Sequence, residues 1–344
     1  MSQNLNQISI AIDAMGGDNG LNTTMPALYK IAEKNNDVNF ICVGNKAKID
    51  LFKNKPSNIE IIHTEEEVSM NDSPSLAIKN KKQSSMRIAI DLVKDLKAHA
   101  CVSAGNTGAL MAISHFRLKM LTGISRPAIM SALPSHKDNV CVRVLDLGAN
   151  VSANAKILQD FAIIGSATAA AEGVANPKIG LLNVGKEQHK GHTEIKKADE
   201  ILKKTQGINY VGFAEGNQIF SGELDVIVCD GFVGNILLKS CEGLISSVGK
   251  SIKNNCKKNP LKILSALIAK YSFKKVINNY HPNNHNGAVL AGLNGIVVKS
   301  HGSASAAAFE SAIYRAIVLA KGQSIDKRVA DILSKNRESL CTQD

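Results

Sequence analysis

The sequence predicts an α/β fold, a three-layer α/β/α sandwich around a mostly parallel sheet. Short apolar runs typical of strands alternate along the chain with longer segments of helical periodicity. The apolar runs are continuous, as expected for strands that helices bury on both faces. Several of these runs end in a polar, glycine-containing turn just before a helical segment, which is where ligands bind in parallel sheets.

The predicted elements follow one another without an internal repeat or a low-complexity linker. Strands are expected at 9–12, 38–43, 59–63, 100–103, 129–133, 140–145, 179–183, 210–213, 226–229 and 296–299. Helices are expected at 23–35, 74–97, 107–120, 154–173, 193–205, 234–254, 260–277, 303–321 and 325–340. A length of 344 residues allows two domains, but this unbroken alternation favours a single α/β/α domain over 1–344.

The composition disfavours a membrane-spanning or exported protein. The chain has no run of about 18 apolar residues, and its first residues lack a basic stretch followed by an apolar one. The seven cysteines form no C-x-x-C pair and mostly lie in apolar runs. We therefore expect reduced, buried thiols and a cytoplasmic location.

The net charge of +11 is unevenly distributed along the chain. No carboxylate occurs between Glu242 and Glu310, whereas nine lysines do, at 250, 253, 257, 258, 262, 270, 274, 275 and 299. Such a segment attracts an acidic protein, nucleic acid or anionic lipid, unless its lysines are simply solvated surface charge. Aromatic residues make up only 4% and Trp is absent, so base stacking, and with it nucleic-acid binding, is disfavoured.

Five polar turns predict an anion-binding basin at one rim of the sheet. They are "DAMGGD" (13–18), "SAGNTG" (103–108), "DLGAN" (146–150), "NVGKE" (183–187) and "DGFVGN" (230–235). Glycine lets backbone N–H groups approach a ligand closely, and a helix N-terminus favours an anion. The predicted substrate-binding residues are Asp13, Gly16, Gly17, Asp18, Ser103, Gly105, Asn106, Thr107, Asp146, Asn150, Asp230, Gly231 and His301. Carboxylates at the strand ends would repel phosphate, so we expect them to orient lysines, glycine amides or a loop.

Some basic and amide side chains near these turns have two interpretations. Lys186 and Lys190 follow a strand, where they could clamp phosphate or lie solvated in a loop. Asn235 could donate to a developing oxyanion or cap the helix that follows. His301 could bind an anion or satisfy a local backbone group.

Several familiar sites are excluded by spacing. The chain has no P-loop, no G-x-G-x-x-G dinucleotide motif and no G-x-S-x-G nucleophile elbow. His281 and His285 lie in a Pro- and Asn-rich stretch that argues against a helical zinc site. A reaction in which phosphate itself is the nucleophile needs only positioning and charge stabilisation.

Taken together, the motifs resemble those of the PlsX-type phosphate acyltransferases. The resemblance runs in order over roughly residues 8 to 321. It is carried by "IAIDAMGGD" (10–18), "SAGNTGALMA" (103–112), "RPAI" (126–129), "DLGAN" (146–150), "GLLNVG" (180–185), "DVIVCDGFVGNILLK" (225–239) and "GLNGIVVKSHGSA" (292–304).

This resemblance implies a reaction and a site. The family transfers an acyl group from acyl-[acyl carrier protein] to inorganic phosphate, and the acyl phosphate feeds a glycerol-3-phosphate acyltransferase in phospholipid synthesis. The implied fold is similar to phosphotransacetylases and isocitrate-dehydrogenase-like enzymes, as a homodimer without a metal or organic cofactor. Lys190 and Asn235 match the residues implied to act in catalysis.

The resemblance also implies peripheral membrane binding through a helical hairpin, here at about 240–280. The segment 259–275 fits this physically, because Pro260 suits the first position of a helix whose apolar and lysine positions fall on different faces. The alternative is a helix in a dimer core. The predicted membrane-contacting residues are Leu261, Leu264, Leu267 and Ile268.

One stretch departs from the family pattern. The family usually has a glycine pair before a proline-containing run, whereas this chain has Asn286 and Gly287 and no proline. This difference concerns local loop geometry and accommodation of the acyl chain. Two other functions remain open: a coenzyme A-dependent phosphotransacylase, which shares the chemistry, and a non-catalytic scaffold that binds carrier protein or lipid, which has no need of so many polar turns.

Overall fold

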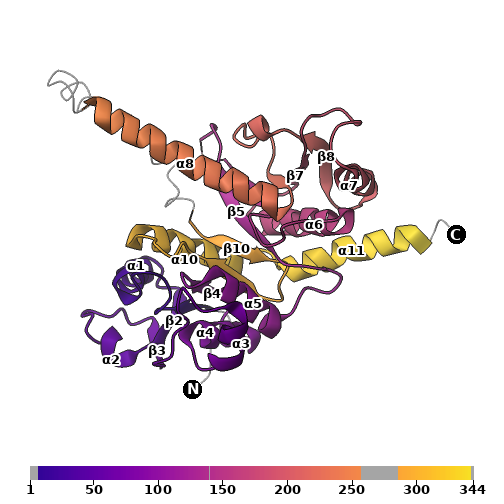
Figure 1. The fold of residues 1–344 in the computed structure, drawn as a ribbon. Helices are drawn as coiled ribbons and strands as arrows, with labels where there is room; N and C mark the ends of the chain where they lie inside the picture. The colour runs from indigo at the N-terminus through magenta and orange to yellow at the C-terminus, as the bar shows by residue number, and fades with distance from the viewer. Residues whose placement is uncertain (1–6, 139, 257–285, 342–344) are drawn as a thin grey trace.

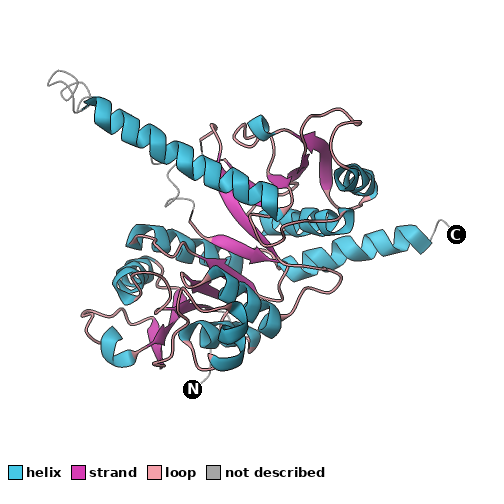
Figure 2. Cartoon of the chain, viewed as in Figure 1, coloured by secondary structure: helices cyan, strands magenta, loops and turns pink. Residues whose placement is uncertain are grey.

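The computed structural model describes residues 7–138, 140–256 and 286–341. The described residues form one 11-stranded sheet in the order β3-β2-β1-β4-β11-β10-β5-β6-β9-β7-β8. Helices cover both of its faces (Figures 1 and 2). The predicted α/β/α sandwich with a mostly parallel sheet is therefore confirmed.

The described elements have these bounds. The strands are β1 (Ile8–Asp13), β2 (Val38–Gly44), β3 (Ile59–His63), β4 (Ala100–Ser103), β5 (Ala128–Pro134), β6 (Cys141–Leu145), β7 (Lys178–Leu182), β8 (Asn209–Ala214), β9 (Val226–Val228), β10 (Ala288–Ala291) and β11 (Ile296–Lys299). The helices are α1 (Leu21–Lys34), α2 (Lys46–Ile49), α3 (Pro74–Asn80), α4 (Ser85–Lys94), α5 (Thr107–Leu118), α6 (Ala155–Ala171), α7 (Thr193–Lys204), α8 (Gly231–Cys256), α10 (Ala306–Lys321) and α11 (Ile325–Cys341), with a 3₁₀ turn at Gly216–Gln218.

The core lies on both faces of the sheet. Strand side chains such as Ile10, Ala11 and Ile12 on β1 are fully buried, because α1 and α10 pack on one side of β1 and α4 on the other. Helix α6 is buried almost throughout its length, with Phe161 inaccessible to solvent. This all-round burial explains why the strands and α6 read as continuous apolar sequence.

The strand direction reverses at the centre of the sheet. The successive pairs β11–β10, β10–β5 and β5–β6 are antiparallel, whereas the pairs outside them are parallel. Strands β1, β4 and β11 therefore run opposite to β6, β9 and β7. The expectation of a single carboxyl rim is wrong, because the carboxyl ends of the strands in the two halves point in opposite directions along the sheet.

Two other predictions about elements are wrong. The helix expected over 74–97 is interrupted, because the Ser84 hydroxyl caps a new helix by accepting from Arg87 N at 3.3 Å. Strand β10 was not predicted, since its four small or aliphatic residues follow an Asn-rich stretch and depend on pairing with β11 and with the distant strand β5.

Helix α8 projects from the body of the molecule (Figure 1). It begins at Gly231, three residues before the predicted start. The hairpin expected at about 240–280 is described only as far as Cys256. The predicted helix 260–277, with Leu261, Leu264, Leu267 and Ile268, lies outside the described residues. No helix within the described ranges is long and apolar enough to cross a membrane.

Candidate active site

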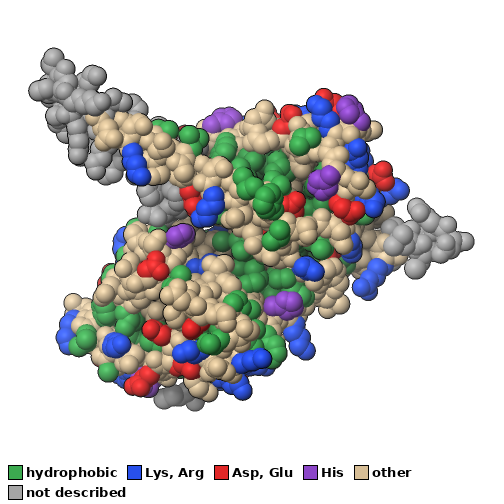
Figure 3. All heavy atoms as spheres, viewed as in Figure 1, with side chains coloured by type: hydrophobic (Ala, Val, Ile, Leu, Met, Phe, Trp, Pro, Cys, Tyr) green, Lys and Arg blue, Asp and Glu red, His purple; other side chains and the backbone are tan. Residues whose placement is uncertain are grey.

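A cavity of about 700 Å³ lies over the centre of the sheet, where the strand direction reverses. Residues from both halves line it: Asp18, Thr107 and Lys299 from one, and Gly148 and Asn235 from the other. Figure 3 shows hydrophobic side chains gathered near the centre of one face of the molecule. The two sets of polar turns thus contribute to one site although their strands run in opposite directions.

Asp13 organises the turns of the first half. Its buried carboxylate accepts from the hydroxyls of Ser85 and Ser103, each at 2.6 Å. Burial raises the pKa of Asp13, while these hydrogen bonds act in the opposite direction. Gly16 packs against this carboxylate so closely that a Cβ there would lie 2.6 Å from Asp13 Oδ2 and 2.8 Å from Gly105 N. Asp13 therefore joins two turns and does not itself line the cavity.

Asp146 organises the turns of the second half. Its fully buried carboxylate accepts from the backbone N–H groups of Ile129 (2.9 Å), Ala149 (3.1 Å) and Asn150 (2.6 Å), and from the Asn150 side-chain amide (2.9 Å). The carbonyl of Asn150 in turn accepts from Gly231 N at 2.7 Å. This chain of contacts seats the start of α8 on the turn at 146–150.

The contacts between the start of α8 and the turn at 146–150 hold Asn235 at the cavity. A Cβ at Gly234 would lie 1.8 Å from the carbonyl oxygen of Asp146, so only glycine allows the helix to approach this closely. Asn235 follows and lies beside Gly148 on the cavity wall. Its exposed side chain forms no hydrogen bond with the part of the chain that the structure describes. The cap of α8 is Asp230, which accepts from Val233 N at 2.8 Å, so the alternative that Asn235 caps this helix is wrong.

Lys299 is a site residue that the sequence reasoning missed. It was counted among the lysines of the basic segment, yet it is only 8% exposed and lines the cavity. Its ammonium donates to the carbonyls of Ala104 (3.1 Å) and Ser300 (2.5 Å). Burial lowers the pKa of Lys299 to about 8, although the carboxylates of Asp13 and Asp18 act in the opposite direction. The sequence feature that could have identified Lys299 as a site residue is its position as a lysine at the end of an otherwise apolar strand.

His301 lines the same end of the cavity. Its Nδ1 lies 2.9 Å from the Ser303 hydroxyl, and its backbone N–H donates to Asn286 Oδ1 at 3.0 Å. The amide of Asn286 donates to Ser300 Oγ at 2.6 Å and to the Ala308 carbonyl at 2.9 Å. The residue that departs from the family pattern therefore supports the turn that carries His301.

Lys190 does not line this cavity. Its ammonium pairs with Glu187 at 2.8 Å in the loop after β7, and its side chain is 41% exposed. The hydrogen bond from Lys190 lowers the pKa of Glu187. Asn183 ties the same loop by donating to the carbonyls of Gly185 and Lys190. Lys190 is therefore not among the residues that line the cavity with Asn235.

The remaining predicted residues divide by position. Asp18, Thr107 and His301 line the cavity with Asn235. The others shape or anchor the turns behind it: Asp13, Gly16, Gly17, Ser103, Gly105, Asn106, Asp146, Asn150, Asp230 and Gly231. Within the described ranges, no group of three or more His, Cys, Asp or Glu side chains is placed to hold a metal ion.

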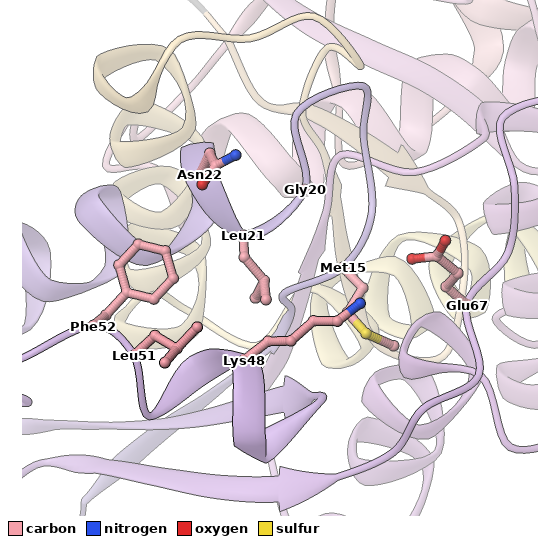
Figure 4. A pocket seen from close by; sticks show the side chains of 8 residues that line it. All are labelled: Met15, Gly20, Leu21, Asn22, Lys48, Leu51, Phe52 and Glu67. Atoms are coloured by element: carbon pink, nitrogen blue, oxygen red, sulfur yellow. The ribbon is translucent and has the colours of Figure 1, made fainter.

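A second hollow of about 510 Å³ lies at the carboxyl ends of β1 and β2. Figure 4 shows its mainly apolar wall, with the Lys48 side chain extending toward Met15 and Glu67 beyond. It contains none of the predicted site residues. The cavity over the centre of the sheet is therefore the better candidate for the active site.

Known proteins with this fold include acyl-transferring enzymes. A phosphotransacetylase from Streptococcus pyogenes superposes with a TM-score of 0.62 and 16% identity, over 92% of this chain and 94% of that one. A branched-chain phosphotransacylase from Enterococcus faecalis superposes with a TM-score of 0.58 and 13% identity, over 92% and 100%. The similarity at these identities is one of fold.

Relatives in sequence are much closer. Proteins named phosphate acyltransferase from Coxiella burnetii and Legionella pneumophila are 47% and 46% identical, over 95% and 94% of this chain and 96% and 95% of theirs. The family described as "Fatty acid synthesis protein" matches residues 8–327.

The fold and the relatives in sequence define an acyltransferase built on an α/β fold. More specifically, the chain belongs to the family of PlsX-type phosphate acyltransferases, as its motifs predicted.

The close packing of the start of α8 on the turn at 146–150 can be tested through stability. We expect Gly234→Ala to lower the free energy of unfolding by about 1–3 kcal/mol, because its Cβ would overlap the Asp146 carbonyl. The matched control is Gly243→Ala in the same helix, where nothing lies within 4 Å of an added Cβ. It should raise stability by about 0.5–1 kcal/mol. Urea unfolding measures the stability of both variants, and equal midpoints would contradict the close contact of Gly234 with the Asp146 carbonyl.

Proposed function

We propose that the chain transfers a fatty acyl group from acyl-[acyl carrier protein] to inorganic phosphate, and that 1–344 acts as one catalytic domain. The acyl phosphate would feed a glycerol-3-phosphate acyltransferase in phospholipid synthesis. The observation that supports this most is the composition of one cavity, whose polar groups lie next to an apolar wall. The name phosphate acyltransferase carried by the relatives supports the same chemistry.

The apolar part of the cavity suits an acyl chain. Its wall comes from the end of β5, the 3₁₀ turn region and α8, through Leu133, Pro134, Phe220, Leu238 and Ile245. Burying a methylene contributes about 0.8 kcal/mol, so a long chain gains affinity from such a surface. Leu238 and Ile245 lie further along α8 than Asn235, which gives the chain a direction along that helix, and α8 projects from the body of the molecule (Figure 1).

The polar part suits the reacting carbonyl and phosphate. An oxygen of phosphate attacks the thioester carbon and forms a tetrahedral oxyanion. Asn235, free of other partners in the described chain, donates its amide N–H to that oxyanion. The carbon–sulfur bond then breaks, and the carrier thiol leaves. Three helices of more than two turns begin near this region, at Thr107, Gly231 and Ala306, and their N-termini favour negative charge.

Lys190 remains a proposed catalytic residue. Because it does not line the cavity of its own chain, its action requires a different loop position or its supply by a second copy in a homodimer.

Asn235 provides the most direct test of the oxyanion contact. We expect Asn235→Ala to lower kcat by about 10²–10³, because one oxyanion donor is lost. Asn235→Asp should be at least as defective, since a carboxylate repels the oxyanion. Acyl phosphate formation is measured by trapping with hydroxylamine, with folding checked by circular dichroism. Turnover near that of the wild type in both variants would refute this role.

The catalytic role of Lys190 is tested by comparison with a control lysine that forms the same kind of ion pair. Lys190→Ala should lower turnover by about 10- to 100-fold, the value of a hydrogen bond to a charged group. The control is Lys197→Ala, because Lys197 also pairs with a glutamate three residues earlier, Glu194, at 3.1 Å. Equal activity of the two variants would remove Lys190 from the mechanism.

The apolar wall is tested through chain length. Leu238→Trp should lower kcat/KM for long acyl chains about tenfold more than for short ones, because it displaces roughly two methylenes from the wall. Val211→Trp, at a half-exposed position on β8 remote from the cavity, should leave this ratio unchanged. A Leu238→Trp enzyme with the wild-type ratio would place the chain elsewhere.

Membrane and partner contacts belong to the same proposal. The basic segment between Glu242 and Glu310 has no carboxylate, so it would attract an anionic membrane surface or the acidic carrier protein. We therefore propose a cytoplasmic enzyme that associates peripherally with membranes. Assays with carrier-protein and coenzyme A thioesters in parallel decide between the two acyl donors.

A further inference from the structure

Lys299 lies at an unusual place for a lysine. It is the last residue of β11, in register with Ser103 on β4 and with Ala288 on β10. Only 8% of it is exposed, yet it forms part of the cavity wall together with Thr107 and Asn235. A lysine is rarely buried unless it is paired, so this position calls for a chemical reason.

The hydrogen bonds of Lys299 leave one donor unused. An ammonium group has three N–H bonds. Two of them are directed at the carbonyls of Ala104 and Ser300, at 3.1 and 2.5 Å. No third acceptor is found in the part of the chain that the structure describes. The two carbonyls therefore fix the position of Nζ and leave one N–H for a ligand in the cavity.

The charge of Lys299 is also uncompensated at short range. No carboxylate of the described residues lies within 4 Å of its Nζ. The Asp13 carboxylate acts on it only at longer range, and its two oxygens are already engaged by Ser85 and Ser103. Burial without a partner lowers the pKa of Lys299 to about 8. An anion bound in the cavity would offset this desolvation cost.

We propose that Lys299 binds the inorganic phosphate that attacks the acyl group, as the cation of a phosphate subsite beside Thr107 at the start of α5. This inference rests on the proposed function. Hydrogenphosphate forms the new oxygen–carbon bond, the carbon–sulfur bond breaks with its electron pair on sulfur, and the phosphate proton passes to the thiolate. Lys299 contacts a phosphate oxygen throughout, whereas Asn235 contacts the oxygen of the carbonyl.

The subsite can be tested without the acyl donor. Titration calorimetry measures the binding of inorganic phosphate to the full chain. Lys299→Met keeps a similar side-chain length without the charge, and we expect phosphate affinity to fall by about 10- to 100-fold. The control is Lys30→Met, which removes a surface lysine paired with Glu310 at 2.7 Å, and it should bind phosphate as the wild type does. Wild-type affinity in Lys299→Met would overturn the proposal.

The wild-type protein provides a second test that needs no variant. Inorganic phosphate is essentially dianionic only above about pH 8, and from there to about pH 10 the Lys299 ammonium, whose pKa burial lowers to about 8, loses its proton. Phosphate affinity should therefore fall between about pH 8 and 10, and a flat profile over that range would contradict the proposal. The other charged groups around Nζ are Asp13, Asp18, His301, Lys239 and Glu242, and the profile of Lys299→Met records their contribution.

Kinetics separate this subsite from the overall reaction. In steady-state assays Lys299→Met should raise KM for phosphate by about 10- to 100-fold and leave KM for the acyl thioester unchanged. An equal rise in both values would indicate a structural role and overturn the inference. If wild-type protein binds phosphate but forms no acyl phosphate, the proposed function fails while the phosphate subsite stands.

Discussion

Four hydrogen bonds converge on the buried carboxylate of Asp146, and the geometry of the candidate site depends on them. They fold the turn at 146–150 tightly against β5, and this turn accepts the start of α8 through Gly231 and Gly234. The close approach of the helix places Asn235 at the cavity wall. Asp13 has a similar function in the other half of the sheet, where it accepts from the hydroxyls of Ser85 and Ser103, so both carboxylates anchor the turns.

Because the strand direction reverses at the centre of the sheet, the cavity is lined by both polar and apolar groups from the two halves. On one side, β11 ends with Lys299, and on the other side β9 leads into α8 with Asn235. Strands β10 and β5 lie between them and present their side chains to the cavity. A cation, an amide and an apolar wall therefore surround one space, which no single parallel half of the sheet could provide. This combination suits the acyl thioester and phosphate that we propose as substrates.

Most of the fold could be predicted from sequence, because strands buried on both faces read as continuous apolar runs and the helices between them have clear periodicity. The turns could be predicted from their glycines and the family from their motifs. Strand β10 could not, since its four residues depend on pairing with β5 and β11. Nor could the burial of Lys299, which depends on the carbonyls of Ala104 and Ser300. Nor could the absence of Lys190 from the cavity lining, since the placement of the loop after β7, where Lys190 pairs with Glu187, depends on tertiary structure and not on any local pattern.

The reaction that we propose for this cavity joins an acyl carbon to inorganic phosphate. The most direct measurement mixes the purified full-length protein with a long-chain acyl-carrier-protein thioester, with and without phosphate, and traps the product with hydroxylamine. We expect phosphate to raise acyl hydroxamate well above the background from direct reaction of hydroxylamine with the thioester, with an equal increase in free carrier thiol. Thiol release at the same rate with and without phosphate, or no hydroxamate above that background from correctly folded protein, would contradict this.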